Sequence, residues 1–473
     1  MDMALILAGG QGKRMKTDKP KALMEVLGIP MIGWVLDACN QAGISEQIVI
    51  KGFAHEMLQE YLDSVGNIKT AYQSERLGTG HAVMCGAELI RKAMPENVII
   101  LCADAPFIDS DTISKSLEYH KAAGNSVTVV TADIPSPFGY GRIIRDGESL
   151  LGIVEQRDCT EEQTKITEVN SGCFWFKTED LLESLGKLST DNSQGEYYLT
   201  DTVGILVSEG KKAGAFKTAN KNAVLGANDR VGLLRLADVA RHIVIDRLAE
   251  KGVDFVSSEG IIISPRADIE AGATILPNTI IDGESKVYTG AVVGPNTRVT
   301  KSIIRANAKV DSSVLDSCDV GENCDVGPFA RLRPNAVLKD YAHVGNFAEI
   351  KNSTLGVGTA VSHLTYIGDS EVGSNVNFGC GVAVANYNGD TKNLCVVKDD
   401  AFIGCHTNLI SPVTVGEGAY VGANSTITKD VPDGALAVER GELHIFENQG
   451  RKRLGRHLAK GEAVRAKVKA ENK

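Results

Sequence analysis

A glycine-rich loop near the start of the chain holds the first residues that could do chemistry. It reads Leu7-Ala-Gly-Gly-Gln-Gly-Lys-Arg-Met-Lys-Thr-Asp-Lys-Pro-Lys21 and follows a short apolar stretch. Glycines after a strand let backbone N–H groups approach a phosphate, and lysine and arginine can offset its charge. The loop is neither a Walker loop nor Gly-x-Gly-x-x-Gly. On spacing alone, a glycine turn with a solvated basic face is the competing interpretation.

A second set of chemical residues lies in the C-terminal half. Arg333 and Lys351 are 18 residues apart, and His363 and Tyr366 follow them. If the chain returns to the same edge every 18 residues, the two cations stack and can hold an anionic group beside a candidate base. An imidazole can accept a proton at neutral pH, because its ordinary pKa is about 6.5. A solvated basic ladder with a histidine at a turn is the alternative.

A six-residue repeat would stack these residues. Neither a helix nor an ordinary strand has this period, whereas a parallel β-helix of hexapeptide repeats has it. A β-sandwich would show alternation and irregular spacing instead. The period breaks between Val384 and Val397, where the polar segment 386–393 predicts an extruded loop. The aliphatic positions are Ile263, Ile269, Ile275, Ile281, Val287, Val293 and Val299, then Val314, Val320, Val326, Leu332, Leu338, Val344 and Ile350, then Val397, Ile403, Leu409, Val415, Val421 and Ile427.

Residues 1–225 alternate between candidate strands and helices. This order predicts an α/β domain with a mainly parallel sheet, whose ligands lie at the carboxyl ends of the strands. Asp104 follows one such strand and is a candidate Mg²⁺ ligand, unless it caps the segment that begins at Ala105. The expected strands are Met3–Leu7, Gln47–Lys51, Val98–Cys102 and Ser126–Thr131, and the expected helices are Ile32–Ala42 and Gly80–Ala93.

Length and charge narrow the function classes. At 473 residues the chain suggests two to four domains, and 43% hydrophobic residues support a sizeable core. The net charge is −10, but residues 451–473 carry nine Lys/Arg and two Glu, so the rest is acidic. An acidic body argues against nucleic-acid binding, and a solvated end is the simpler interpretation of the basic tail.

The cysteines and the apolar segments bear on the compartment. Ten cysteines form no Cys-x-x-Cys pair and do not cluster with histidine. They predict reduced thiols in a cytoplasmic protein rather than zinc or disulfides. The first apolar run is too short for a signal peptide, and no segment reaches the roughly 18 apolar residues that span a bilayer. We therefore expect no membrane association.

Several motifs in collinear order resemble the sugar-1-phosphate nucleotidyltransferases. The loop Leu7–Met15 with Pro20-Lys21 resembles their signature loop, 73–82 their base-reading segment and 139–143 their sugar-side loop. Residues 153–156, 168–172 and 194–198 match as well. With the repeat attached, residues 4–440 resemble the bacterial bifunctional N-acetylglucosamine-1-phosphate uridylyltransferases/glucosamine-1-phosphate acetyltransferases. The resemblance implies a Rossmann-like α/β nucleotidyltransferase domain with a mainly parallel sheet, followed by a left-handed parallel β-helix of hexapeptide repeats.

For the first half, the resemblance implies Mg²⁺-dependent transfer of uridylyl from UTP to N-acetylglucosamine-1-phosphate. Arg14 and Lys21 would meet phosphates and act as catalytic residues. Asp104 and Asn228 would hold the metal. The nucleotide and sugar-nucleotide contacts would be Leu7, Ala8, Gly9, Gly10, Lys21, Gln73, Gly78, Thr79, Asp104, Gly141, Glu155, Asn170 and Asn228, with Gln73 at the uracil edge and Gly141, Glu155 and Asn170 at the acetamido sugar.

For the second half, the resemblance implies acetyl transfer from acetyl-CoA to glucosamine-1-phosphate. His363 would be the general base. The sugar phosphate would be bound by Arg333, Lys351, Tyr366 and Asn377, and acetyl-CoA by Cys380, Asn386, Tyr387, Cys405, Ala423 and Arg440. The product would be UDP-N-acetylglucosamine for cell-wall precursor synthesis. Because the flat faces of a β-helix can bury one another, a homotrimer is expected.

Some positions depart from the family pattern. Lys13 stands where Thr is common, Cys102-Ala103 where Tyr-Gly or similar precedes the metal Asp, and Cys380 and Cys405 where Ala and Ser are frequent. None of these removes a charged group that the chemistry needs.

The expected domains are 1–228 for uridylyl transfer, a linker helix at 229–251, a β-helix at 252–440 and a basic tail at 441–473. Asn228-Asp229 resembles a helix N-cap, and Leu234, Ala237 and Leu248 are expected on the helix's apolar stripe. Two alternatives stay open. One is a monofunctional nucleotidyltransferase with a regulatory or oligomerising β-helix, and the other is a non-catalytic trimeric scaffold.

Overall fold

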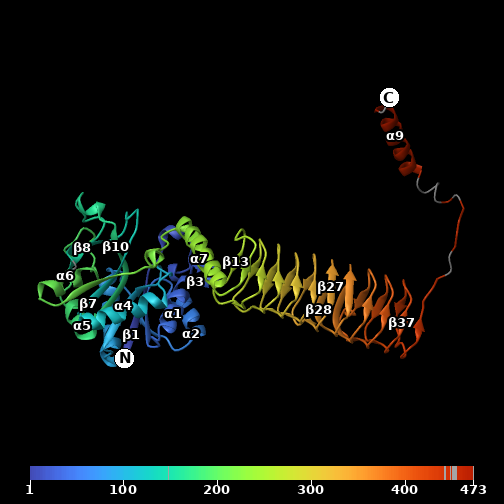
Figure 1. Cartoon of the computed structure of the whole chain (residues 1–473), viewed down its shortest axis with the longest axis horizontal. Coiled ribbons are helices and arrows are strands. Elements are labelled where there is room, and N and C mark those ends of the chain that lie inside the picture. The colour runs from blue at the N-terminus through green and yellow to red at the C-terminus, as the bar shows by residue number, and fades with distance from the viewer. Residues whose placement is uncertain (148, 442–443, 448, 450–454, 472–473) are drawn as a thin grey trace. The chain divides into compact units, whose positions relative to one another are not determined.

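The computed structural model describes residues 1–147, 149–441, 444–447, 449 and 455–471 (Figure 1). Contacts divide the chain into two compact units, Met1–Thr289 with Arg298–Lys301, and Gly290–Thr297 with Ser302–Lys473. Part of the expected basic tail, at 442–443, 448, 450–454 and 472–473, lies outside the described residues; within the tail, helix α9 spans Gly455–Glu471. No described helix is long and apolar enough to cross a membrane.

A nine-stranded, mainly parallel sheet forms the centre of the first unit, as predicted. Its order is β11-β7-β10-β6-β1-β4-β5, and β8 and β9 form a hairpin attached to β10. The strands are β1 (Asp2–Ala8), β4 (Gln47–Lys51), β5 (Lys69–Tyr72), β6 (Asn97–Cys102), β7 (Val127–Asp133), β8 (Arg142–Asp146), β9 (Ser149–Val154), β10 (Glu168–Lys177) and β11 (Ala213–Lys217), and a separate hairpin joins β2 (Glu25–Val26) to β3 (Ile29–Pro30).

Alternating residues of β1 contribute to two cores, one on each face of the sheet. Met3 and Leu5 pack with residues of α3, α5 and α6, whereas Ala4 and Ile6 pack with residues of α1, α2 and α4. This two-sided burial is why β1 is apolar throughout. The helices are α1 (Met31–Gln41), α2 (His55–Val65), α3 (Thr79–Ala93), α4 (Ser110–Ala123), α5 (Thr178–Leu185) and α6 (Asp201–Ser208), and the 3-10 turns are η1 (Lys13–Met15), η2 (Lys21–Leu23), η3 (Gln163–Lys165) and η4 (Lys221–Val224).

Strand β10 was not among the strands expected from the alternating pattern. It lies between β6 and β7 and is antiparallel to both. Phe174, Trp175 and Phe176 are all buried, as in a strand covered on both faces. The register shifts between Asn170 and Cys173, so the start of β10 is irregular where the motif 168–172 lies.

Helix α7 (Arg230–Glu250) follows the sheet. Asp229 caps it by accepting a hydrogen bond from the backbone N–H of Gly232 at 2.8 Å. The expected stripe is partly wrong, because Leu234 is 72% exposed while Leu236 is buried. Because an α-helix has 3.6 residues per turn, two residues that are two positions apart, such as Leu234 and Leu236, point to nearly opposite sides. The buried side is formed by Leu236, Ala240, Val244, Ile245 and Leu248.

The first coils of the β-helix belong to the first unit. Each short strand pairs in parallel with the strand three positions later, as β13 does with β16 and β16 with β19. The predicted aliphatics Ile263, Ile269 and Ile281 are buried. The strands are β12 (Asp254–Phe255), β13 (Ile262–Ile263), β14 (Asp268–Ile269), β15 (Thr274–Ile275), β16 (Ile280–Ile281), β17 (Lys286–Val287) and β19 (Arg298–Thr300).

The same parallel stacking fills the second unit, where Figure 1 shows the short strands in succession past β27, β28 and β37. Most strands there pair with the strand three positions later, and some, such as β27 with β29, with the strand two positions later. The predicted parallel β-helix is thus confirmed. Its strands are β18 (Val292–Val293), β20 (Ile303–Ile304), β21 (Lys309–Val310), β22 (Val314–Asp316), β23 (Asp319–Val320), β24 (Asp325–Val326), β25 (Arg331–Leu332), β26 (Val337–Leu338), β27 (His343–Asn346), β28 (Glu349–Leu355), β29 (Ala360–His363), β30 (Tyr366–Val372), β31 (Asn377–Phe378), β32 (Ala383–Ala385), β33 (Cys395–Val397), β34 (Phe402–Ile403), β35 (Asn408–Ile410), β36 (Val413–Val415), β37 (Tyr420–Val421), β38 (Thr426–Ile427) and β39 (Leu436–Ala437).

One predicted core position of the repeat is wrong. Val314 is only half-buried, and the neighbouring Leu315 is fully buried instead. The inward positions here are Val310, Leu315 and Val320, so the chain takes two five-residue steps in place of six.

Candidate functional site

A cavity of about 270 Å³ opens at the carboxyl ends of β1 and β6. It is where a doubly wound sheet is expected to bind its ligand. Nine of the expected nucleotide and metal contacts line this one cavity: Leu7, Ala8, Gly9, Gly10, Lys21, Gln73, Gly78, Thr79 and Asp104. Arg14 does not line it, and lies exposed on η1.

A lysine lies between the two candidate metal ligands. Lys21 Nζ donates to Asn228 Oδ1 at 2.8 Å and forms a short ion pair with Asp104 Oδ2. The Lys21 side chain is only 10% exposed, so it is not a solvated surface lysine. At the segment that begins at Ala105, the backbone N–H of Ala105 donates to Cys102 O at 3.2 Å rather than to the Asp104 side chain. The next helix, α4, is capped by Asp109, which accepts from the backbone N–H of Thr112 at 2.6 Å. The Asp104 carboxylate and the Asn228 amide oxygen therefore face one point at which a cation is held.

This donor set is compatible with Mg²⁺. Magnesium takes one or two protein oxygens and completes its coordination with phosphate oxygens and waters. Asp104 and Asn228 supply two such oxygens. Among the described residues, no group of three or more His, Cys, Asp or Glu side chains is placed to hold a metal. A site with few protein ligands is thus the type that these residues could form.

Gln73 is buried at the wall of the cavity. Its Nε2 donates to the backbone oxygen of Gly78 at 3.2 Å and lies 3.2 Å from His81 Nδ1. A Cβ on Gly9 would lie 2.8 Å from Gln73 Oε1, so a larger residue there would displace the Gln73 amide. The amide is held with a donor and an acceptor beside the cavity, as reading a base edge would need.

The three expected sugar contacts lie together beside β10. Asn170 donates its backbone N–H to Gly141 O at 2.9 Å, and a Cβ on Gly141 would lie 3.5 Å from the Glu155 carboxylate. Glu155 accepts from Thr200 Oγ1 at 3.2 Å. Burial raises the pKa of Glu155, with the charges of Asp158 and Asp201 adding to it and the Thr200 hydrogen bond opposing it.

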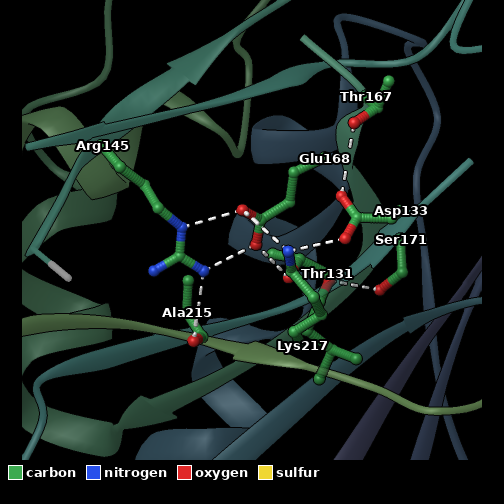
Figure 2. A network of polar contacts seen from close by, with 9 residues as sticks. Thr131, Asp133, Arg145, Thr167, Glu168, Ser171, Ala215 and Lys217 are labelled. Atoms are coloured by element: carbon green, nitrogen blue, oxygen red, sulfur yellow. Dashed lines mark hydrogen bonds and ion pairs between the residues drawn. The ribbon is translucent and has the colours of Figure 1, made fainter. Parts of the chain in front are cut away.

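A polar network holds the start of β10 in place (Figure 2). Glu168 accepts from Arg145 Nη2 at 2.6 Å, Arg145 Nε at 2.9 Å and Thr131 Oγ1 at 2.6 Å. Burial favours the neutral form of Glu168, but these bonds outweigh it, so its pKa is lowered. Lys217 Nζ lies 2.7 Å from Asp133 Oδ2 and 3.7 Å from Glu168 Oε2, so it joins the network as a second cation. The network connects β7, β8, β10 and β11 two residues from Asn170.

Cys102, one of the departures from the family pattern, lines the same cavity. Its Sγ lies 3.7 Å from Gly172 O. Burial, and to a smaller extent the charge of Asp104, raise the pKa of this thiol to about 12. Cys102 is therefore a neutral wall of the cavity.

In the second unit the β-helix register brings the expected sugar-phosphate cations together. Leu332 of β25 lies opposite Ile350 of β28, so Arg333 and Lys351 occupy equivalent positions of successive coils. Arg333 Nη1 donates to Glu349 Oε1 at 2.8 Å, and Lys351 Nζ lies 3.6 Å from Asp369 Oδ2.

His363 lies exposed at the end of β29. Its Nδ1 is 2.8 Å from Asn346 Oδ1, and the two residues pair in register between β27 and β29. Because an amide oxygen only accepts, Nδ1 is the donor in this contact, so in the neutral ring the lone pair is on Nε2. Tyr366 begins the next strand and Asn377 begins β31. This tautomer is the one that a general base needs.

A buried carboxylate organises the loop expected at 386–393. Asp369 accepts from Asn352 Nδ2 at 2.6 Å and from Asn386 Nδ2 in a short bond. Burial disfavours its charge, but these bonds and the nearby lysines lower its pKa. The Lys351 ammonium in turn lowers the pKa of Lys392. The ammonium groups of Lys351 and Lys392 therefore lie near each other, beside the buried Asp369 carboxylate.

The expected acetyl-CoA positions fall into two sets. Cys380, Cys405 and Ala423 recur on successive coils, and Arg440 donates to the backbone oxygen of Ala423 in a short bond. Asn386 is buried against Asp369, whereas Tyr387 is 60% exposed and donates to Gly389 O at 2.6 Å.

Sequence reasoning missed four residues at these sites. Arg76 and Glu196 line the cavity of the first unit, and Asp369 and Lys392 lie beside Lys351. Asp369 follows Lys351 by 18 residues, the same interval that identified Arg333. The register nevertheless places Gly368 opposite Lys351 and Asp369 opposite Asn352, because this coil is one residue shorter, so the interval alone does not identify Asp369.

Comparison with known proteins matches both halves. The nucleotidyl transferase family matches residues 3–225, and the bacterial transferase hexapeptide family (six repeats) matches residues 394–429. The bifunctional protein GlmU of Acetivibrio thermocellus is 42% identical over 447 residues, which cover 94% of this chain and 96% of the relative. That of Clostridium acetobutylicum is 43% identical over 445 residues (94% and 97%), and that of Halalkalibacterium halodurans 42% over 438 residues (92% and 96%).

Proposed function

We propose that this chain, which belongs to the bifunctional GlmU family, makes UDP-N-acetylglucosamine in two steps. It transfers acetyl from acetyl-CoA to glucosamine-1-phosphate, and then uridylyl from UTP to the resulting N-acetylglucosamine-1-phosphate. The product feeds cell-wall precursor synthesis. The observation that carries the proposal is that one chain holds both clusters, Lys21 with Asp104 and His363 with Arg333 and Lys351. A passive scaffold needs neither.

For uridylyl transfer, a sugar-phosphate oxygen attacks the α-phosphorus of UTP and pyrophosphate leaves. The attacking oxygen is already anionic, so the residues mainly position the reactants and offset charge. In the proposal, Lys21 and Arg14 meet the phosphates, and Gln73 reads the uracil edge. Bound Mg²⁺, held by Asp104 and Asn228, would supply further neutralisation of the polyphosphate.

The remaining proposed contacts fall into two groups, one for the nucleotide and one for the acetamido sugar. The nucleotide lies along Leu7, Ala8, Gly9, Gly10, Gly78 and Thr79, which line the cavity. The acetamido sugar lies at Gly141, Glu155 and Asn170, which neighbour one another beside β10.

For acetyl transfer, the sugar amine must lose a proton to attack the thioester. His363 Nε2 accepts that proton, while Nδ1 donates to Asn346 and fixes the ring. The proton then passes to the leaving CoA thiolate. Arg333 and Lys351 hold the phosphate, Tyr366 and Asn377 the sugar, and Lys392 adds a third cation.

Acetyl-CoA occupies the stacked positions Cys380, Cys405 and Ala423 in this proposal. Arg440 lies at their end, where it contacts Ala423. Asn386 and Tyr387, on the extruded loop, border the pantetheine arm. The protein divides functionally at 1–228, 229–251, 252–440 and 441–473.

A homotrimer is part of the proposal. Phe329 and Phe347 stack at 5.4 Å on successive coils and are 59% and 56% exposed, and Leu364 on the next coil is 59% exposed. Such an apolar ladder favours burial against another copy. The proposal also places the enzyme in the cytoplasm, because all ten cysteines are free thiols. Sedimentation velocity tests the trimer.

Two coupled assays test the function. We expect pyrophosphate release with UTP, N-acetylglucosamine-1-phosphate and Mg²⁺, and CoA thiol release with acetyl-CoA and glucosamine-1-phosphate. Asp104→Ala should abolish only the first and His363→Ala only the second, while Asp111→Ala and His343→Ala serve as controls away from both clusters. Pyrophosphate release without thiol release would favour the monofunctional enzyme with a regulatory or oligomerising β-helix.

A further inference from the structure

Two cysteines stand one above the other on the β-helix. Strands β31 and β34 pair in register, with Phe378 opposite Ile403, so Cys380 and Cys405 occupy the same position of successive coils. The backbone N–H of His406 donates to Cys380 O at 2.7 Å, and that of Asn424 donates to Cys405 O at 2.7 Å. The next coil has Ala423 at this position. Cys405 therefore has one thiol neighbour and one methyl neighbour along the stack.

The spacing of the coils suits a disulfide. Hydrogen-bonded strands lie about 4.8 Å apart, and disulfides join Cα atoms that are about 4.4–6.8 Å apart. The coils approach closely here, since a Cβ on Gly379 would lie 2.9 Å from the Cα of Cys405. Side chains at equivalent positions of neighbouring coils leave in the same direction, so the Cβ atoms start about one coil spacing apart. A small shift of the two turns toward each other must bring them to the roughly 3.5–4.5 Å of a disulfide, after which rotation of the side chains lets the sulfur atoms meet.

Solvent can reach this pair. Cys405 is exposed and Cys380 is half-buried, whereas Cys318, Cys324 and Cys395 of the same unit are buried. Oxidation of thiols follows their accessibility. An oxidant in solution therefore meets Cys405 before any of those three.

We propose that Cys380 and Cys405 form a peroxide-driven intrachain disulfide that blocks the proposed acetyl-CoA positions; the effect on activity, but not the bond itself, rests on the proposed acetyl transfer. The Cys405 thiolate attacks hydrogen peroxide, which gives a sulfenic acid and, after protonation of the leaving hydroxide, water. The Cys380 thiolate then attacks the sulfenic sulfur, forms the S–S bond and releases a second hydroxide that is protonated to water. Two thiols and one peroxide thus give one disulfide and two waters.

The disulfide would act on one activity only. It ties together two of the three stacked positions along which acetyl-CoA is proposed to lie, so acetyl transfer stops until a thiol reductant reopens the bond. Uridylyl transfer continues, because Cys380 and Cys405 both belong to the second unit, whereas the cavity proposed for uridylyl transfer belongs to the first.

The test treats the full-length protein with hydrogen peroxide and follows three readouts. Mass spectrometry of a non-reduced digest detects the Cys380–Cys405 linked peptide, and non-reducing electrophoresis separates intrachain from interchain bonds. CoA thiol release and pyrophosphate release are compared with each protein's own untreated rate. We expect the linked peptide in a protein of monomer mobility, a loss of acetyl transfer of about tenfold or more that dithiothreitol reverses, and steady uridylyl transfer.

Matched variants separate this chemistry from general oxidation. Cys405→Ser and Cys380→Ala should each abolish the linked peptide and the peroxide-dependent loss, whereas Cys159→Ser, which removes a half-buried thiol of the other unit, should keep both. Absence of the linked peptide in a protein that acetylates normally overturns the inference and leaves the proposed function standing. A linked peptide with undiminished acetyl transfer overturns the proposed block of acetyl-CoA binding. An untreated protein that never acetylates refutes the proposed function, while the linked peptide still decides whether the bond forms.

Discussion

Asp369→Asn is the sharpest test of how the acetyl-transfer cluster is held together. Asp369 is not one of the proposed substrate contacts, yet it accepts from Asn352 and Asn386 and faces Lys351 at 3.6 Å. Asparagine has the same shape and tolerates the left-handed backbone at this position (φ 50°). The substitution therefore removes the charge without reshaping the coil.

The expected cost follows from these contacts. One asparagine oxygen can still accept from one neighbour, but the new NH₂ group then faces a second amide donor. The loss of a charge-assisted hydrogen bond and the stranding of a buried donor should together cost about 2–4 kcal/mol of local stability. Without Asp369, the Lys351 and Lys392 ammonium groups also repel each other with no carboxylate between them. We expect KM for glucosamine-1-phosphate to rise about tenfold, which is about 1.4 kcal/mol.

The assays are steady-state acetyl transfer and hydrogen exchange of β28 and β30. The value of kcat should stay within about threefold of wild type, because Asp369 does not contact His363 or Asn346, while amide exchange in the two strands should accelerate by about 30-fold or more. Asp400→Asn is the matched control. Asp400 also has a left-handed backbone (φ 58°) and accepts from Asn375 at 2.7 Å, but it is exposed. A KM within twofold of wild type and unchanged exchange would falsify this account of Asp369.

The contribution of the Asp369 charge to stability also depends on pH. The pKa of Asp369 is lowered in the folded protein, so its charge stabilises the fold at pH values above the ordinary Asp pKa of about 3.9. This stabilisation is lost as the pH falls through the lowered value. Exchange protection of β30 in the wild type should therefore decline in acid, and Asp369→Asn should lack that component.

Three tests concern the first unit. Gly9→Ala would place a Cβ 2.8 Å from Gln73 Oε1, whereas one on Gly10 would meet nothing within 4 Å. Such crowding typically costs about 1–3 kcal/mol, so Gly9→Ala should lower kcat/KM for UTP by about 10- to 100-fold. Gly10→Ala should lower it by much less, and pyrophosphate release measures both. EDTA should stop pyrophosphate release and spare CoA thiol release; loss of both would contradict the metal assignment. Burial lowers the pKa of His120 to about 4, so stability should fall as the pH drops from about 6.5 to about 4 and then level off. Urea titrations followed by tryptophan fluorescence would show this, and a pH dependence retained in His120→Phe would refute it.

The six-residue period predicted the β-helix because burial of one side chain per face is imposed at every coil. It failed only where two aliphatics adjoin, at Val314 and Leu315. Val314 and Leu315 are both aliphatic, so which of the two points into the core depends on the register with the coils on either side. There the chain takes two five-residue steps from Val310 to Val320. A local pattern cannot contain that information.

The central sheet was harder to predict for a related reason. Strands β1, β4 and β6 were expected because each is a short apolar run before a polar loop. Strand β10 was not, although Phe174, Trp175 and Phe176 are buried. Its antiparallel insertion between β6 and β7 is a long-range pairing. Long-range pairing depends on the rest of the sheet, whereas the strand's start, with Gly172 in the left-handed region (φ 78°), has the composition of a loop.

The two sites differ in what sequence could reveal. In the first unit, chemistry follows the ends of strands, and the loop residues found by motif line one cavity. In the second, Arg333 and Lys351 were found by their interval, but Asp369 and Lys392 were not. Their importance arises from contacts between coils and from the extruded loop, which brings Asn386 against Asp369. Side-chain type alone does not distinguish Asp369 from the exposed Asp400.

A repeat that builds a site from its turns leaves those side chains free to vary. Phe378, Ile403 and Val421 are buried and almost fully enclosed, so the core demands an aliphatic or aromatic residue at each coil. Two positions later, Cys380, Cys405 and Ala423 are outside the core, and successive coils contact one another there through backbone hydrogen bonds. A thiol at such a position costs the fold little, because no core packing depends on it. Stacking then places equivalent positions of neighbouring coils about 4.8 Å apart, within the Cα separation that a disulfide spans. Two substitutions that are independent in sequence therefore become one chemical unit in the structure, and the pair Cys380–Cys405 could arise without any change in the scaffold that positions His363.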